Sequence, residues 1–218
     1  DRSERTHQLL YRLALGATLA DIEEVDRLGT DAWIDKQLTM TQVSAGLATQ
    51  MAVLGSIELS TKDIATAYDP PAPQGETAEA RRKRESRRNL PQRELSTSVV
   101  WRAISNQSQT SEVMADFWRN HFSVDMSKDA IDFTVTEWDR MVIRRHVFGT
   151  FAEMLSASAH HPAMLIYLDN AVSRRPPTAT ELKSVARAVR QATGSKERGE
   201  EAQRIAEQNG LNENYARE

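Results

Sequence analysis

Apolar residues in this chain recur three and four positions apart in short runs, and this spacing is the strongest constraint on the fold. Two such sets are Leu9, Leu10, Leu13 and Ala14, and Trp33, Ile34 and Leu38. Because an α-helix repeats every 3.6 residues, this spacing places each set on one helical face. No segment shows the alternation with a period of two that marks a strand. We therefore predict an all-α fold: an irregular multi-helix array of short amphipathic helices, with no sheet.

Particular residues indicate where the helices begin and end. Thr18 is placed to cap a helix that ends at Gly29, and Thr180 is placed to cap a later one. Pro162 suits a first helical turn, because its missing N–H has no intrahelical partner there. The core is expected to take its largest side chains from the apolar stripes of two helices. These are Trp33, Ile34 and Leu38, and Phe117, Trp118 and Phe122.

The pattern divides the chain into three parts. Residues 1–68 read as an N-terminal helical part, and residues 69–94 as a proline-rich loop followed by a basic, exposed helix. The basic run, Arg81 to Arg84 with Arg87 and Arg88, is either a solvated helix face or a patch for an anionic partner. Residues 95–218 read as a helical core part, with an inserted helical pair at about 180–209.

Composition excludes several classes of protein. Of 218 residues, 39% are hydrophobic and 27% are charged, as in an ordinary globular protein. The net charge of −3 argues against a protein whose whole surface is suited to binding nucleic acid. The absence of cysteine excludes disulfides and thiolate ligands, and no apolar run is long enough for a transmembrane segment. Composition leaves the compartment open.

Several ionisable and amide side chains are candidates for a site. We expect catalytic roles for His121, Asp169, Glu213 and Arg217, and binding roles for Asn120, His161, Asn170 and Asn214. Histidine with a carboxylate is the usual general acid and base pair, and the same groups bind zinc or iron. The alternative is a buried polar network that only fixes the register of the helices. No known spacing motif is present, so the metal and the cofactor remain unknown.

The last residues resemble the start of a helix. Glu213 with Arg217, and Asn214 with Glu218, are pairs four residues apart. Such a short segment cannot sustain a helix alone, because nucleation is unfavourable by a factor of about a thousand. We therefore expect the natural protein to continue past Glu218.

Several segments together resemble a known bacterial family. They are Leu9-Leu10-Tyr11-Arg12 to Gly16, Leu28-Gly29 with Trp33 and Gln37-Leu38, Phe117-Trp118-Arg119-Asn120-His121-Phe122, Ile143-Arg144 with Gly149 and Phe151, His161-Pro162-Ala163-Met164 with Tyr167-Leu168-Asp169-Asn170, and Asn212 to Glu218. In order and approximate spacing they are similar to the family catalogued as domain of unknown function 1800. The resemblance implies a mostly helical, exported protein, often encoded beside a family similar to alkaline-phosphatase-like hydrolases. It implies no established reaction, and it implies that this chain holds only the first part of the family domain.

Three functions follow as expectations. The first is a binding or assembly protein, whose partner is another protein or the missing C-terminal half of the family domain. The second is a hydrolase that gathers His121, Asp169 and Glu213 around one cleft, with or without a metal. The third is a purely structural role. The resemblance implies a periplasmic or extracellular location.

Overall fold

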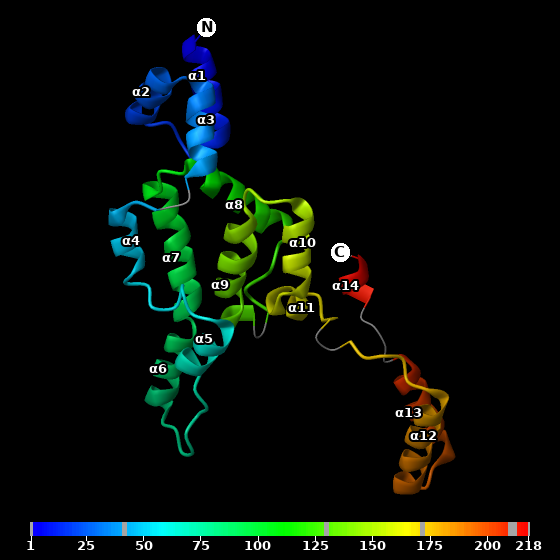
Figure 1. The fold of residues 1–218 in the computed structure, drawn as a ribbon. Coiled ribbons are helices and arrows are strands. Elements are labelled where there is room, and N and C mark those ends of the chain that lie inside the picture. Colours follow the sequence, from blue (N-terminus) through cyan, green and yellow to red (C-terminus); the bar gives the residue numbers. More distant parts are fainter. Residues whose placement is uncertain (1, 41–42, 129–130, 171–172, 209–212, 218) are drawn as a thin grey trace. The chain divides into compact units, whose positions relative to one another are not determined.

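The computed structural model describes residues 2–40, 43–128, 131–170, 173–208 and 213–217. Within these ranges the chain is helical and no residue lies in a strand, which confirms the predicted all-α array of short helices (Figure 1). The contacts divide it into two compact units, Asp1–Ala163 and Met164–Glu218, which are described separately. No helix in these ranges is long and apolar enough to cross a bilayer.

The first unit contains ten α-helices and three short turns of 3-10 or π type among its described residues. They are α1 (Arg2–Leu13), α2 (Leu19–Leu28), α3 (Thr30–Thr39), α4 (Ala45–Met51), α5 (Thr61–Tyr68), α6 (Ala78–Arg88), α7 (Leu90–Ser105), α8 (Gln109–His121), η1 (Ile131–Phe133), α9 (Val135–Trp138), η2 (Asp139–Ile143), η3 (Arg144–His146) and α10 (Phe151–His160). Figure 1 shows α1, α2 and α3 gathered at one end of this unit, beside the start of α8.

Two of the clusters of buried apolar residues in the first unit are each formed by a few neighbouring helices. Leu10, Val25 and Trp33 form the core of α1, α2 and α3, and Trp33 is 2% exposed. Leu47 and Met51 form a second core, against which Trp101 of α7 packs. Short helices have narrow apolar stripes, and in these two clusters neighbouring helices bury their stripes against one another.

The prediction that both aromatic stripes lie in the core is wrong for two residues. Trp33 and Phe122 are buried, but Phe117 is 52% exposed and Leu38 is 47% exposed. Both belong to helices whose apolar stripe is wider than the face that neighbouring helices cover. Helical periodicity identifies the apolar face of a helix, but it does not say how much of that face another helix covers.

A buried glutamine joins α3 to the start of α8. Gln37 is 2% exposed, its Nε2 donates to Gln107 O at 3.0 Å, and its Oε1 accepts from Thr110 N at 3.1 Å. Ser108 Oγ donates to the backbone oxygen of Gln37 at 3.2 Å. These bonds satisfy polar groups at the N-terminal end of α8 that have no intrahelical partner. They hold the end of α3 next to α7 and α8.

Helix α11 (Pro162–Tyr167) begins at the proline that the sequence indicated, at the junction of the two units. The second unit continues with α12 (Ala179–Thr193), α13 (Lys196–Gln208) and α14 (Glu213–Arg217). The predicted cap of α12 at Thr180 is wrong by two residues. Thr178 is the cap, because it forms a capping box with Glu181, three residues later, which Thr180 cannot do.

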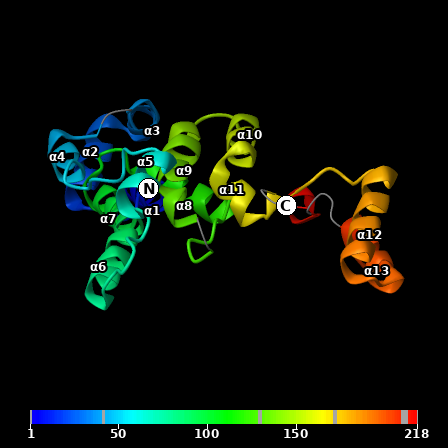
Figure 2. The ribbon, with the colours of Figure 1, turned by 90° about the horizontal axis from the view of Figure 1, so that it is seen from below.

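Helices α12 and α13 form a closely packed pair, seen side by side in Figure 2. Gly194 ends α12 with φ of 69°, a left-handed conformation that glycine adopts without strain. At Gly199 the two backbones approach so closely that a Cβ atom would lie 2.7 Å from Ala186 O. The pair therefore depends on a glycine at this contact.

Candidate functional site: a charged cleft between α3, α7, α8 and η3

The site begins with an irregular helical segment. Helix α9 runs directly into η2, a π-helical turn, and then into the 3-10 turn η3. In a regular α-helix, Asp139 and Arg144 would point about 140° apart, because each residue turns the helix by about 100°. In the π-helical turn Arg144 Nε instead donates to Asp139 Oδ2 at 2.8 Å. Such π-turns inside helices are frequent at functional sites.

Asp139 is the centre of a buried ionic network. It is 4% exposed, and its other carboxylate oxygen accepts from Arg119 Nε of α8 at 2.6 Å. Burial alone would raise the pKa of Asp139, but the charges of Arg144 and Arg119 and their hydrogen bonds outweigh burial and lower it. Asp139 is therefore ionised and bound from two sides.

Arg144 connects Asp139 to a second buried carboxylate. Its Nη1 donates to Glu112 Oε1 at 3.1 Å and to Glu112 Oε2 at 3.0 Å. On the other side of Glu112, Asn106 Nδ2 donates to Oε1 at 2.7 Å. Burial would lower the pKa of Arg144, but Asp139 and Glu112 outweigh it and raise that pKa. The network thus joins α7, α8, η2 and η3.

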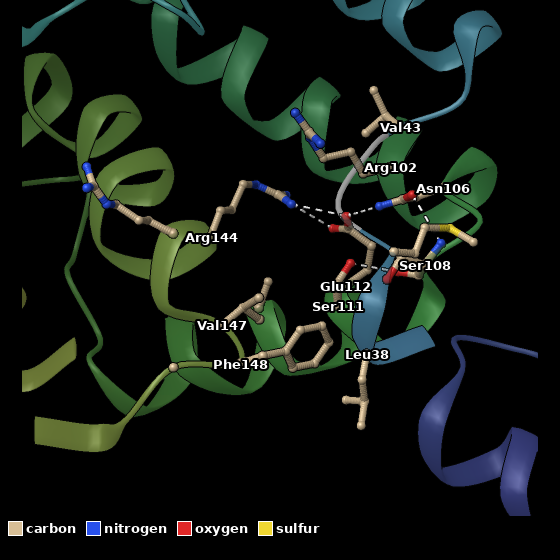
Figure 3. A pocket seen from close by; sticks show the side chains of 14 residues that line it. Leu38, Val43, Arg102, Asn106, Ser108, Ser111, Glu112, Arg144, Val147 and Phe148 are labelled. Carbon is tan, nitrogen blue, oxygen red and sulfur yellow. Dashed lines mark hydrogen bonds and ion pairs between the residues drawn. The ribbon is translucent and has the colours of Figure 1, made fainter. Parts of the chain in front are cut away.

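This network forms part of the wall of a cleft of about 410 Å³ (Figure 3). In Figure 3, Arg144 reaches across to Glu112, and Asn106 contacts Glu112 from the opposite side. The remaining wall is largely apolar. Its apolar side chains are Leu38, Met40, Val43, Ala115, Val147 and Phe148, and its polar side chains include Ser108, Ser111 and Arg145. The cleft therefore has a charged wall facing apolar side chains, an arrangement typical of small-molecule sites.

Arg102 of α7 lines the same cleft and has an unusual environment. Its Nε is buried without a hydrogen-bond partner, and no ion pair to its guanidinium is found among the described residues. Burial is the main cause that lowers the pKa of Arg102, and the neighbouring charge of Arg144 lowers it further. Among the partly buried groups around the cleft, three guanidinium groups (Arg102, Arg119 and Arg144) face two carboxylates (Glu112 and Asp139), which leaves one positive charge unbalanced. Arg145 also lines the cleft, but its side chain is exposed to solvent.

The predicted catalytic histidine lies outside this cleft. His121 is exposed at the end of α8, where its ring contacts Phe117, Trp118, Phe122 and Phe151. No carboxylate of the described residues accepts a hydrogen bond from its ring. The neighbouring Asn120 is exposed, and its Nδ2 donates to Asp116 O at 3.0 Å within the same helix.

His161, a predicted binding residue, has a local role at the junction of α10 and α11. Its Nδ1 accepts the backbone N–H of Ala163 at 3.2 Å. Burial lowers the pKa of His161, and the nearby charge of Glu137 offsets this only in part. The imidazole is therefore held neutral, with Nδ1 as the acceptor.

The other predicted residues belong to the second unit. Asp169 adopts a left-handed φ of 58°, and the backbone oxygen of Asn170 accepts from Ser173 N at 3.0 Å. Asn214 and Arg217 are exposed on α14, and the side chain of Glu213 lies outside the described residues. His121 belongs to the first unit, so the shared pocket of His121, Asp169 and Glu213 stays a prediction. Within the described ranges, no group of three or more His, Asp or Glu side chains is placed to hold a metal ion.

The basic run on α6 is partly neutralised by acidic neighbours. Arg84 Nε lies 3.0 Å from Glu76, and Arg88 Nε lies 3.0 Å from Asp132. Arg81 Nε lies 2.8 Å from Glu85. Helix α6 buries no residue, so the run is a solvated helix face on which three of the six basic side chains are paired with carboxylates.

Sequence reasoning missed the charged residues of the cleft and of its ionic network. Arg119 and Arg144 lie inside two of the segments that carry the family resemblance, and this was the only signal for them. Glu112 and Asp139 are separated by 27 positions in the sequence, and no periodic pattern connects residues so far apart. Arg102 lies on a helix whose remaining pattern indicates only an apolar face.

The fold and the cleft together define an all-helical protein whose first unit encloses a charged, arginine-lined site. The chain belongs to the family described as protein of unknown function (DUF1800), whose model matches residues 8–218. The family resemblance of the sequence is thereby confirmed. No curated protein and no solved structure matches the chain.

Proposed function

We propose that this is a binding protein, and that the cleft between α3, α7, α8 and η3 holds an anionic group of its ligand. The observation that carries the proposal is Arg102, which lines the cleft with a buried Nε that has no partner among the described residues. A half-buried charge without a counter-charge is costly, so proteins normally pair it. An anionic ligand supplies the missing pair.

Binding is favoured over hydrolysis by the state of the charged groups in the cleft. Asp139 is ionised and bound by two arginines, with a lowered pKa that makes it a poor general base. Glu112 is bound by Arg144 and Asn106. These contacts support a rigid recognition surface, and no observed feature favours the hydrolase.

The proposal is tested with small anions and one arginine variant. The thermal midpoint of the chain is measured with acetate, inorganic phosphate and the neutral acetamide, at constant ionic strength because salt screens charges. With a Kd of about 1 mM, about 50 mM ligand stabilises by about 2.3 kcal/mol, which raises the midpoint by about 5–9 °C. Arg102→Gln should abolish this rise. Arg82→Gln is the matched control, because Arg82 is exposed on α6.

Two outcomes would contradict the proposed function. In one, no anion raises the midpoint more than acetamide does. In the other, the anions raise it equally in the wild type and in the Arg102→Gln variant, which means that they act on the protein elsewhere.

The family resemblance also supports a location, and we propose that the protein acts in the periplasm or outside the cell. Immunodetection in fractionated cells that express the natural gene tests this. Accumulation with cytoplasmic markers alone would refute it.

A further inference from the structure

We infer that the ligand of this cleft is a small organic acid with one carboxylate and an apolar body. The inference rests on the proposed function, because it names the chemical class of the anion that the cleft holds. Three features of the cleft carry it: the balance of charge, the apolar wall and the volume.

The balance of charge selects a monoanion. Arg119 and Arg144 are already bound to Asp139 and Glu112, and Arg145, which also lines the cleft, is exposed to solvent, so Arg102 carries the one partly buried positive charge that is left over. One carboxylate neutralises it. A phosphate dianion would place its second negative charge close to the buried carboxylate of Glu112, which is 3% exposed and also lines the cleft. Like charges in a partly buried site repel strongly, because the effective dielectric constant there is low.

Arginine is the side chain best suited to a carboxylate. Its planar guanidinium presents several N–H donors in a fixed arrangement that matches the two oxygens of a carboxylate. Arg102 has no protein carboxylate to bind among the described residues, whereas Arg119 binds Asp139 and Arg144 binds both Asp139 and Glu112. The geometry points to Arg102 as the residue that binds the head group of the ligand.

The apolar wall of the cleft favours a ligand whose body is apolar. Leu38 and Phe148 both line the cleft, yet they remain 47% and 39% exposed. Val43 and Val147 extend this wall, and Figure 3 shows Leu38, Val147 and Phe148 on the side of the cleft away from Arg102. Covering exposed apolar side chains with an apolar ligand is favourable, whereas a fully polar ligand gains nothing from them.

The volume limits the size of the ligand. A cleft of about 410 Å³ lies at the lower end of the range of about 300–1,000 Å³ for small-molecule sites. It suits an acid of the size of 3-phenylpropionate rather than a long lipid. The head group then lies at Arg102, and the ring lies against Phe148 and Val147.

Titration calorimetry with four probes tests this inference. They are 3-phenylpropionate, acetate, inorganic phosphate and the neutral 3-phenylpropionamide. We expect 3-phenylpropionate to bind at least about tenfold more tightly than each of the others, since burial of an apolar body contributes roughly this much or more. Arg102→Gln should weaken 3-phenylpropionate at least about tenfold. Phe148→Ser should weaken 3-phenylpropionate but leave acetate unchanged.

The outcomes separate this inference from the proposed function. If phosphate binds as tightly as 3-phenylpropionate and Arg102→Gln abolishes both, the binding function stands and the selection of a monoanion is wrong. If acetate binds as tightly as 3-phenylpropionate, or if Phe148→Ser does not weaken the binding of 3-phenylpropionate, the inference that the ligand has an apolar body is wrong. If no probe distinguishes the wild type from Arg102→Gln, both proposals fail. Phe148 is partly exposed, so Phe148→Ser keeps the test valid should the arginine variant fold poorly.

Discussion

Replacing Asp139 by asparagine should strongly destabilise the first unit. The carboxylate of Asp139 is 4% exposed and lies 2.6 Å from Arg119 Nε and 2.8 Å from Arg144 Nε. Asparagine has nearly the same shape, but it leaves the guanidinium group of Arg119 without its counter-charge and leaves Arg144 with Glu112 alone. Removing one partner of a buried ion pair costs about 3–5 kcal/mol.

This loss is large compared with the total stability of a domain, which is about 5–15 kcal/mol. At about 2–4 °C per kcal/mol, Asp139→Asn should lower the thermal midpoint by about 6–20 °C. Urea denaturation followed by circular dichroism measures the free energy of unfolding directly. The matched control is Asp116→Asn in the exposed part of α8, which should change that free energy by less than about 0.5 kcal/mol.

The pH dependence gives an independent test of the same pair. Burial alone would raise the pKa of Asp139, but Arg144 and Arg119 lower it below its ordinary value. A carboxylate with a lowered folded pKa contributes stability that is fully present above the unfolded pKa of about 3.9. That stability is lost as the pH falls through the folded pKa. The difference between wild type and Asp139→Asn should therefore shrink below about pH 4. A loss under about 1 kcal/mol at pH 7, or a difference that grows in acid, would refute the reasoning.

Two further predictions concern other parts of the fold. Gly199→Ala should destabilise the pair of α12 and α13, because its Cβ would lie 2.7 Å from Ala186 O, whereas Gly46→Ala in the open part of α4 should not. Hydrogen exchange of the amides of α12 and α13 measures this, and unchanged protection in Gly199→Ala would contradict it. His161 should titrate below its usual pKa of about 6.5, because burial disfavours the imidazolium more than Glu137 stabilises it. Stability should then fall as the pH drops from about 6.5 toward the folded pKa. An NMR titration midpoint at or above 6.5 would show that the imidazole is not held neutral.

Much of the secondary structure could be predicted from local patterns. Thr18 caps α2 with its side chain, and Gly29 follows the last residue of that helix. Pro162 begins α11. These residues act on backbone groups within a few positions, so the ends of these helices can be predicted from the sequence alone. The cap of α12 shows the limit of this reasoning, because Thr178 and Thr180 are both plausible, and only the partner three residues later decides between them.

Burial was harder to predict than helix formation. The apolar periodicity of α3 places Trp33 and Leu38 on the same helical face. Trp33 is nevertheless 2% exposed, whereas Leu38 is 47% exposed. The difference arises from the neighbouring helices, which cover only part of the face. Phe117 on α8 and Phe122, which directly follows that helix, differ for the same reason.

The sequence by itself determined that the chain is all helical, where many of its helices begin and end, and which family it belongs to. These properties depend on hydrogen bonds and side-chain spacing within one or two helical turns. Only the tertiary structure decided that Arg102, Glu112, Arg119, Asp139 and Arg144 meet beside one cleft. The reason is that electrostatic pairing acts through distance in space, and the π-helical turn at Asp139 together with the packing of α7 and α8 sets that distance.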